Sequence, residues 1–218
     1  MIVHHPASEI LSAYASGALG AGAALVVATH VDICAVCRNE VSLLEGLGGS
    51  FLATAATAPL SEGALERVLA RLEDEAVPPQ PRTPARLPDF LAHFDIPKRL
   101  RSYDIGSRLW LAPGIWFAPI RMERDDETCT YLIRGASTKT LPRHTHPGRE
   151  FTAVLSGAYS EELGHFAAGD FAEADSSILH AQTVTADAEC LCLICSDGPM
   201  KFKALSARVI QSFAGRRY

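Results

Sequence analysis

Residues 30–37 read HVDICAVC, and they place His30, Cys34 and Cys37 with three and then two residues between them. On one continuous helix, positions i, i+4 and i+7 lie on the same face, so these three side chains can converge on one ion. A tetrahedral zinc site needs a fourth ligand, and the candidate is His5, with the adjacent His4 as the alternative. The stretch therefore predicts a closed, structural Zn²⁺ site that pins the N-terminal segment to a helix.

The residues on either side of this stretch predict a small helical domain. Pro6 suits the first turn of a helix, and apolar residues recur at helical spacing over residues 10–18. Further helices are expected at about residues 21–30 and 34–44, with glycines 46, 48 and 49 ending the latter, although the spacing leaves open whether the break falls before or after His30. A fourth helix, capped by Ser61, carries an apolar stripe of Leu65, Val68, Leu69 and Leu72.

A proline-rich stretch divides the chain. VPPQPRTPARLP, residues 77–88, contains five prolines and predicts an extended linker. Beyond it, short runs rich in aromatic and β-branched residues alternate with turn residues, which is typical of a jelly roll or small barrel. The expected fold class is α + β with two domains: a zinc-binding helical bundle at 1–76, the linker at 77–88, and an all-β domain at 89–218.

A second ligand set lies in the β half. His144-x-His146-x3-Glu150 places two histidines on one face of a strand, and a Pro-Gly turn can bring the glutamate onto that face. His180, from a later strand, is the residue type that completes a site of three histidines and one carboxylate. Such a site accepts Zn²⁺ or another divalent transition metal.

Composition and charge narrow the function classes. The 218-residue chain has a net charge of −5, and neither half has the basic surplus that phosphate contacts require, so direct nucleic-acid binding is not expected. No apolar run is long enough to span a bilayer, and the N-terminus lacks a signal-peptide pattern, so we expect a cytoplasmic protein without a membrane partner.

The six cysteines then indicate ligands or redox thiols before disulfides. Cys190 and Cys192 share one face of a strand and Cys195 the other, which is a poor geometry for a disulfide. We interpret all three as small apolar residues of a buried strand, and oxidation at these thiols stays open as the alternative.

The β half resembles the cupin family. HTHPGRE at residues 144–150 followed by Gly157 is similar to the first cupin motif at every position. The stretch from Gly169 to His180 is similar to the second, with Asp175 and Ser177 where proline and glycine are usual. Because the ligand His180 is retained, the resemblance implies a metal-binding cupin.

Both halves together resemble the ChrR-type zinc-binding anti-sigma factors over nearly the whole chain. The residues that carry the resemblance are His5-Pro6, YASG at 14–17, THVDICAVC at 29–37 and the cupin ligands. The resemblance implies that the N-terminal zinc domain sequesters an extracytoplasmic-function-type sigma factor of RNA polymerase. It also implies that the metal-binding cupin mediates a response to oxidants such as singlet oxygen.

The expected protein is thus a regulator with no catalytic residues. The alternative is a cupin metalloenzyme, of the dioxygenase or isomerase type, in which the helical half mediates dimerisation.

Overall fold

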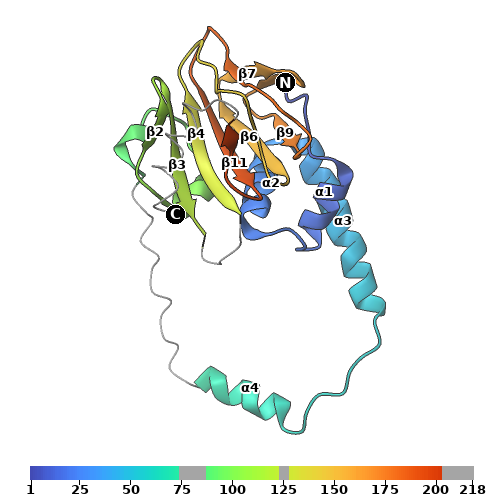
Figure 1. Cartoon of the computed structure of the whole chain (residues 1–218). Helices are drawn as coiled ribbons and strands as arrows, with labels where there is room; N and C mark the ends of the chain where they lie inside the picture. The colour runs from blue at the N-terminus through green and yellow to red at the C-terminus, as the bar shows by residue number, and fades with distance from the viewer. Residues whose placement is uncertain (74–86, 123–127, 203–218) are drawn as a thin grey trace.

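The computed structural model describes residues 1–73, 87–122 and 128–202, and in these ranges a set of helices precedes a sheet-rich half (Figure 1). Two 3-10 helices, η1 (Asp89–Leu91) and η2 (Lys98–Ser102), lead into the first strand. The α-helices are α1 (Ser8–Ala15), α2 (Ala21–Ile33), α3 (Ala35–Thr54) and α4 (Ala64–Glu73). Most of the predicted linker, residues 77–86, lies outside the described residues, so the proposed domain boundaries stay a prediction.

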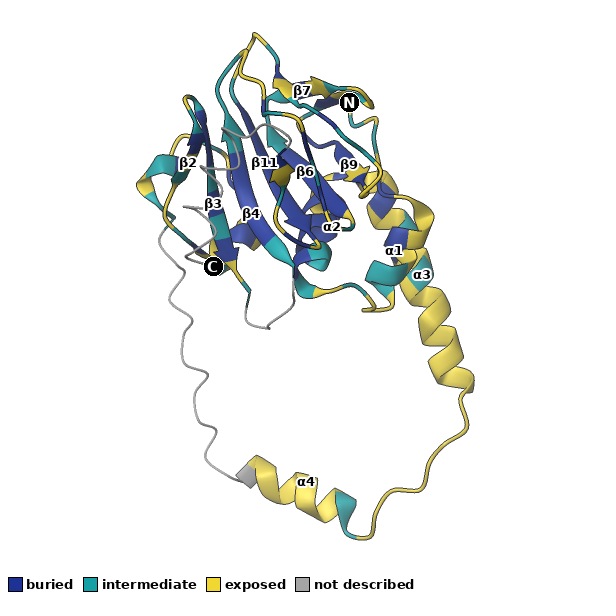
Figure 2. Cartoon of the chain, in the orientation of Figure 1, coloured by how far each residue is buried: buried dark blue, intermediate teal, exposed yellow. Residues whose placement is uncertain are grey.

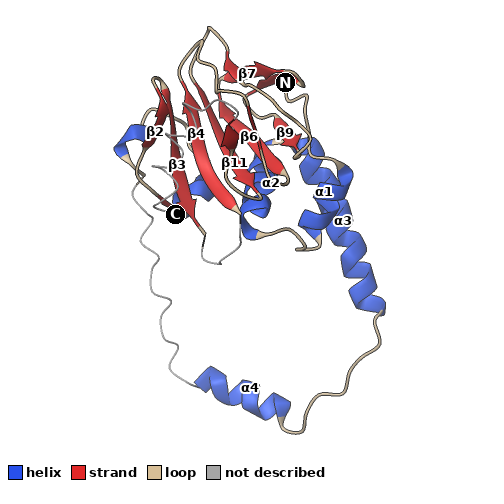
Figure 3. Cartoon of the chain, in the orientation of Figure 1, coloured by secondary structure: helices blue, strands red, loops and turns tan. Residues whose placement is uncertain are grey.

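The strands form one large antiparallel sheet and two small ones (Figure 3). The large sheet has the order β1-β3-β4-β11-β6-β9, with β2 paired to β3, and the small sheets have the orders β10-β7-β8 and β12-β5. The strands are β1 (Asp104–Ile105), β2 (Leu109–Ala112), β3 (Ile115–Arg121), β4 (Cys129–Gly135), β5 (His144–Thr145), β6 (Glu150–Ser156), β7 (Ala158–Glu161), β8 (Gly164–Ala167), β9 (Phe171–Ala174), β10 (Thr183–Val184), β11 (Cys190–Ser196) and β12 (Lys201–Phe202).

The large sheet is buried on both faces, which explains the continuous apolar run in β11. Leu191, Leu193 and Cys195 pack in a cluster with residues of α1 and α2. Cys190 and Cys192 face the opposite way, into a second cluster with residues of the small sheets such as Tyr159 and Phe166. Because side chains alternate along a strand, one face of the sheet is covered by helices and the other faces the interior of the β half. The predicted opposite orientation of Cys195 is confirmed.

Helix α2 lies directly against the large sheet (Figures 1 and 2). Val26 and Val27 are fully buried, and α2 contacts β4, β6 and β11. The approach is closest at Gly22, where an added Cβ would lie 2.2 Å from Thr130 Oγ1 and 2.8 Å from Cys195 Sγ. The first three helices and the sheet therefore share one hydrophobic core, whose apolar burial stabilises both halves together.

Two predicted helix ends were wrong. Helix α3 does not stop at residue 44 but continues through Gly46, Gly48 and Gly49 to Thr54. A helical glycine costs only about 1 kcal/mol relative to alanine, and these three lie in open space, so nothing forces the helix to end there. The fourth helix begins at Ala64, three residues after Ser61.

The second half of α3 and all of α4 extend away from the rest of the molecule and are mostly exposed (Figure 2). Leu43, Leu47 and Phe51 follow one another at intervals of four along α3 and are 52–76% exposed. On α4, the predicted apolar stripe is also exposed. Large apolar side chains on one face of an uncovered helix mark a surface that contacts another molecule.

Within the described residues, no single helix is long and apolar enough to cross a membrane. Helices α2 and α3 are long and apolar enough only when they are counted together, and the chain bends by 116° between them.

Candidate metal centres

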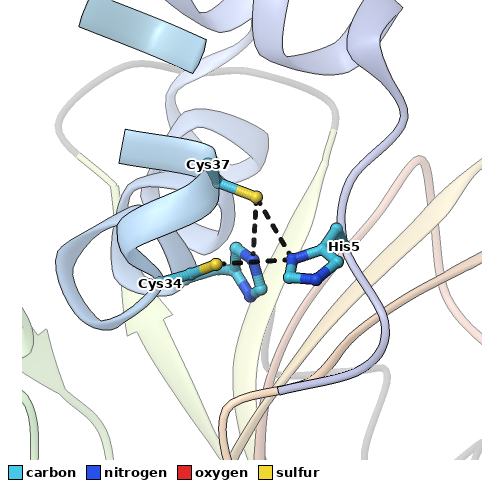
Figure 4. A group of neighbouring side chains, drawn as sticks. His5, Cys34 and Cys37 are labelled. Atoms are coloured by element: carbon cyan, nitrogen blue, oxygen red, sulfur yellow. Dashed lines mark hydrogen bonds between the residues drawn. The ribbon is translucent and has the colours of Figure 1, made fainter. Parts of the chain in front are cut away.

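The N-terminal ligand set comes together as a compact cluster. His5 Nδ1 lies 3.3 Å from Cys34 Sγ and 3.4 Å from Cys37 Sγ (Figure 4), and His30 Nε2 lies 3.3 Å from Cys37 Sγ. The four ligand atoms all lie within 4.8 Å of one another. His4, the alternative ligand, is directed elsewhere, with Nδ1 3.4 Å from Asp170 Oδ2. Two imidazole nitrogens and two thiols at this separation fit a tetrahedral Zn²⁺.

A one-residue break between α2 and α3 creates this geometry. Cys34 adopts an extended conformation, with φ −96° and ψ 107°, and the two helices meet at 116°. His30 therefore comes from the last turn of α2 and Cys37 from the first turn of α3. The expectation that one helix face presents all three ligands was wrong: the bend turns Cys34 and Cys37 toward the N-terminal segment, where His5 lies.

Burial sets the protonation states of this cluster in the absence of a metal, with a neutral imidazole at His30 and a protonated thiol at Cys37. His30 is fully buried, and burial, together with the nearby His5, lowers the pKa of its imidazole below the ordinary value. Its Nδ1–H donates to the Gly169 carbonyl at 2.8 Å, which leaves the Nε2 lone pair directed into the cluster. Burial raises the pKa of the Cys37 thiol to about 12, and the Cys34 thiol and Glu40 carboxylate add to the rise. A bound cation would offset the cost of the buried thiolates, so metal binding is coupled to proton release.

The second ligand set lies inside the β half. His144 is in β5, His146 follows it, and Glu150 is the first residue of β6. His180 pairs with His144 through two backbone hydrogen bonds of 3.1 and 3.2 Å. His146 Nε2 lies 3.1 Å from Glu150 Oε2 and 3.3 Å from His180 Nε2, and all four ligand atoms lie within 4.8 Å of one another.

Partners outside the cluster orient two of these histidines. The Nδ1 atom of His144 lies 2.9 Å from the Pro142 carbonyl oxygen, and the Nδ1 atom of His180 lies 2.5 Å from Oε2 of Glu161 in β7. With Nδ1–H donating outward, Nε2 of each ring is free to act as a ligand. A carboxylate behind a ligand histidine fixes the tautomer and raises the basicity of the ring.

The same residues are poorly accommodated as a metal-free buried cluster. Burial lowers the pKa of His144 to about 4 and that of His146 to about 3, with neighbouring histidines adding to both shifts. Burial also raises the pKa of Glu150 to about 8. Glu150 Oε2 is buried and, although it lies 3.1 Å from His146 Nε2, it makes no hydrogen bond of good geometry among the described residues. A divalent cation at this point would supply the missing contact, so the residues fit a metal with nitrogen and oxygen ligands.

Local structure explains both the matches to the cupin motifs and the departures from them. Gly157 has φ +70°, and an added Cβ would lie 2.1 Å from the Glu189 carbonyl oxygen, so only glycine fits. In the second motif, Asp175 Oδ1 accepts a 2.8 Å hydrogen bond from the Ser177 N–H. This aspartate turn replaces the usual proline and glycine before His180.

Two of the four remaining cysteines, Cys190 and Cys192, form a close pair. Cys190 Sγ and Cys192 Sγ are 3.6 Å apart, buried and not joined by a disulfide. Hydrogen bonding to Cys190 and burial raise the pKa of Cys192 well above its ordinary value, so it is a protonated, apolar thiol at neutral pH.

Three residues near the two sites were not identified from the sequence: Glu161, Gly169 and Asp170. Each acts through a contact between segments far apart in the chain, and no local spacing signals such a contact.

Comparison with known proteins covers both halves. Residues 104–200 match the family described as the ChrR Cupin-like domain. The chain is 33% identical to the Anti-sigma-E factor ChrR of Cereibacter sphaeroides over 97% of this chain and 98% of that protein. It is also similar to a chain in the crystal structure of Rhodobacter sphaeroides SigE in complex with the anti-sigma ChrR. That match has a TM-score of 0.72 and 32% identity, and it covers 90% of this chain and 99% of the other.

These matches confirm the predicted fold class, an α + β protein with a helical N-terminal part and a cupin. They do not support the alternative of a cupin metalloenzyme with a helical dimerisation domain, because the relative that matches along its full length is a regulatory protein. The chain belongs to the ChrR family of anti-sigma factors.

Proposed function

We propose that this protein is an anti-sigma factor that sequesters an extracytoplasmic-function-type sigma factor in the cytoplasm and keeps it from RNA polymerase. The observation that carries the proposal is the full-length relationship to an anti-sigma factor, since the match includes the helical half as well as the cupin. The related solved structure is a complex between such a protein and SigE. The exposed apolar stripes of α3 and α4 supply a surface of the kind a protein partner covers.

In this proposal the N-terminal metal is a structural Zn²⁺ held by His5, His30, Cys34 and Cys37. Four protein ligands leave no open position, so the ion joins the N-terminal segment to α2 and α3 and does no chemistry. By orienting α3 relative to α2, the ion sets the direction in which the exposed stripe of α3 projects.

The helical surface can be tested on α4 in the full-length protein. Leu65 and Leu69 lie on the apolar stripe, whereas Ala70 lies on the opposite face of the same helix. Burying a leucine contributes about 1.5–3 kcal/mol, so L65E/L69E should weaken sigma binding by about a hundredfold or more, while A70E should change it little. The assay measures affinity for each purified extracytoplasmic-function sigma factor of the source organism, and inhibition of transcription by the matching holoenzyme. Wild-type protein that neither binds nor inhibits any of them would refute the proposal.

The cupin half is assigned the second metal, Zn²⁺ or another divalent transition metal, and the response to oxidants of the singlet oxygen type. Family membership and a complete, buried ligand set support this assignment. The test generates singlet oxygen with a photosensitiser and light, and follows dissociation of the sigma complex. The wild-type complex should dissociate faster than the H144A complex. Equal dissociation rates for the two complexes would show that the cupin metal has no role in the response to singlet oxygen.

A further inference from the structure

A short segment of the cupin half, residues 169–171, holds the N-terminal ligand histidines in place. Asp170 is 3% exposed, and its carboxylate accepts hydrogen bonds from three backbone N–H groups: Val3 at 2.7 Å, His4 at 3.1 Å and Ala167 at 2.9 Å. Burial alone would raise the pKa of Asp170, but these hydrogen bonds, together with the nearby His4 side chain, outweigh burial and lower it. The buried carboxylate is thus fully used in joining residues 3 and 4 to the turn before β9.

The backbone of His4 is held on both sides. Its N–H donates to Asp170, and its carbonyl oxygen accepts a 3.0 Å hydrogen bond from the Phe171 N–H. The N-terminal segment therefore pairs with the start of β9 in the manner of an added strand residue. His5 follows directly, so the direction in which its side chain leaves the backbone is fixed by this pairing.

Gly169 completes the contact from the side of α2. Its carbonyl oxygen accepts the Nδ1–H of His30, as described above. Its φ is +96°, and an added Cβ would lie 2.8 Å from Ile2 Cγ1 and 3.6 Å from Ile33 Cδ1, so only glycine allows both segments to approach. Three consecutive cupin residues thus contact both histidines of the N-terminal cluster or the segments that carry them.

We propose that Asp170 is a positioning residue of the N-terminal metal site, contributed by the cupin half, which fixes His5 through the backbone of residues 3 and 4. The inference rests on the proposed ligand set of that site, and it is independent of sigma binding. Partners that hydrogen-bond a metal ligand directly typically contribute 10- to 100-fold to metal affinity, and we expect an effect of about this size from Asp170, which acts one residue before the ligand.

The test is cobalt binding to the full-length protein. Only the N-terminal site contains thiolates, so a thiolate-to-cobalt charge-transfer band reports on that site alone, and competition with a chelator of known affinity gives its dissociation constant. In D170N, one carboxylate oxygen is replaced by an NH₂ group. That group cannot accept a hydrogen bond from the backbone N–H it faces. The variant should therefore bind cobalt 10- to 100-fold more weakly at the N-terminal site. The amount of metal bound at the cupin site should equal that of the wild-type protein.

Two control variants make the result specific. E173Q removes a carboxylate three residues after Asp170, on the exposed side of the adjoining strand β9, and should leave the charge-transfer titration unchanged. H4A keeps the backbone hydrogen bonds of residue 4 and should stay within about twofold of wild type, a range well below the effect of losing an outer partner.

The possible outcomes separate the hypotheses. A wild-type protein without the band would contradict the proposed ligand set. A normal wild type with wild-type affinity in D170N would overturn the role of Asp170 alone. Equal weakening in H4A would also overturn it, because the His4 side chain would then be the group that matters. Loss of metal from both sites in D170N would indicate general unfolding and would count against a positioning role.

Discussion

Replacing Gly22 by alanine tests whether α2 and the cupin sheet share one core. In a helix, this change by itself stabilises the folded state by about 1 kcal/mol. Here the new Cβ would lie 2.2 Å from Thr130 Oγ1 and 2.8 Å from Cys195 Sγ, and both side chains are buried. Overpacking a core typically costs about 1–3 kcal/mol, and two contacts this short place G22A near the upper end of that range. The expected net result is a destabilisation of about 1–2 kcal/mol.

The matched control is Gly46→Ala in α3. Gly46 also lies within a helix, but no atom lies within 4 Å of the point that an added Cβ would occupy, so only the helix propensity remains and G46A should stabilise by up to about 1 kcal/mol. Denaturant unfolding of the metal-loaded proteins, followed by circular dichroism, gives both values. For a domain of this size, G22A should lower Tm by about 2–8 °C. If G22A were as stable as G46A, α2 would not be packed against the sheet, and the shared core would be refuted.

Three further results are expected. C37S should lose N-terminal zinc and sigma binding together, measured by metal analysis and titration, and a sigma-binding C37S protein without zinc would separate the two properties. E161Q should weaken metal binding at the cupin site by about 10- to 100-fold and leave the N-terminal cobalt band unchanged; an unchanged cupin affinity would show that the contact to the ligand histidine is dispensable. Metal-free protein should be most stable near pH 6.5. As pH falls below that value, the depressed pKa values of His144 and His146 remove stability, and as pH rises toward 8 the raised pKa of Glu150 does so. Unfolding of chelator-treated E150Q across pH should show a smaller alkaline decline than wild type, and the raised pKa of His180 accounts for the part that remains.

The candidate ligand clusters were accessible from the sequence because residue type and spacing encode them locally. The histidines and cysteines of residues 30–37, and His144, His146 and Glu150, lie close together in the chain, and the structure brings each set into one cluster. The helix ends were less accessible. Glycine lowers helix propensity by an amount that packing or an open environment can outweigh, so the three glycines of α3 did not end it. The break at Cys34 brings its thiol to His5, which lies 29 residues away in the chain, and no local spacing signals that contact.

The contacts between the halves were not accessible for a different reason. Asp170 and Gly169 are ordinary turn residues in the sequence, and their importance comes from partners more than a hundred residues away. Gly22 resembles any tolerated helical glycine until the sheet is placed against it. Local propensity and periodicity carry no information about such pairs, so the sequence predicts two domains in succession, whereas the structure shows a shared core.

Strand β9 gives that shared core a functional meaning. At its start, Asp170 and Phe171 hold residues 3 and 4 beside the ligand His5, and at its end, Ala174 pairs in register with the ligand Glu150. The candidate ligand Glu150 and the residue before the candidate ligand His5 thus both pair with the same four-residue strand. A displacement of β9 would therefore alter both coordination spheres, whereas a side-chain change that leaves the strand in place affects only the site it contacts. D170N is expected to weaken metal binding only at the N-terminal site, because it frees the segment of residues 3 and 4 that pairs with β9. E161Q is expected to weaken metal binding only at the cupin site, because it changes a contact from β7 to His180.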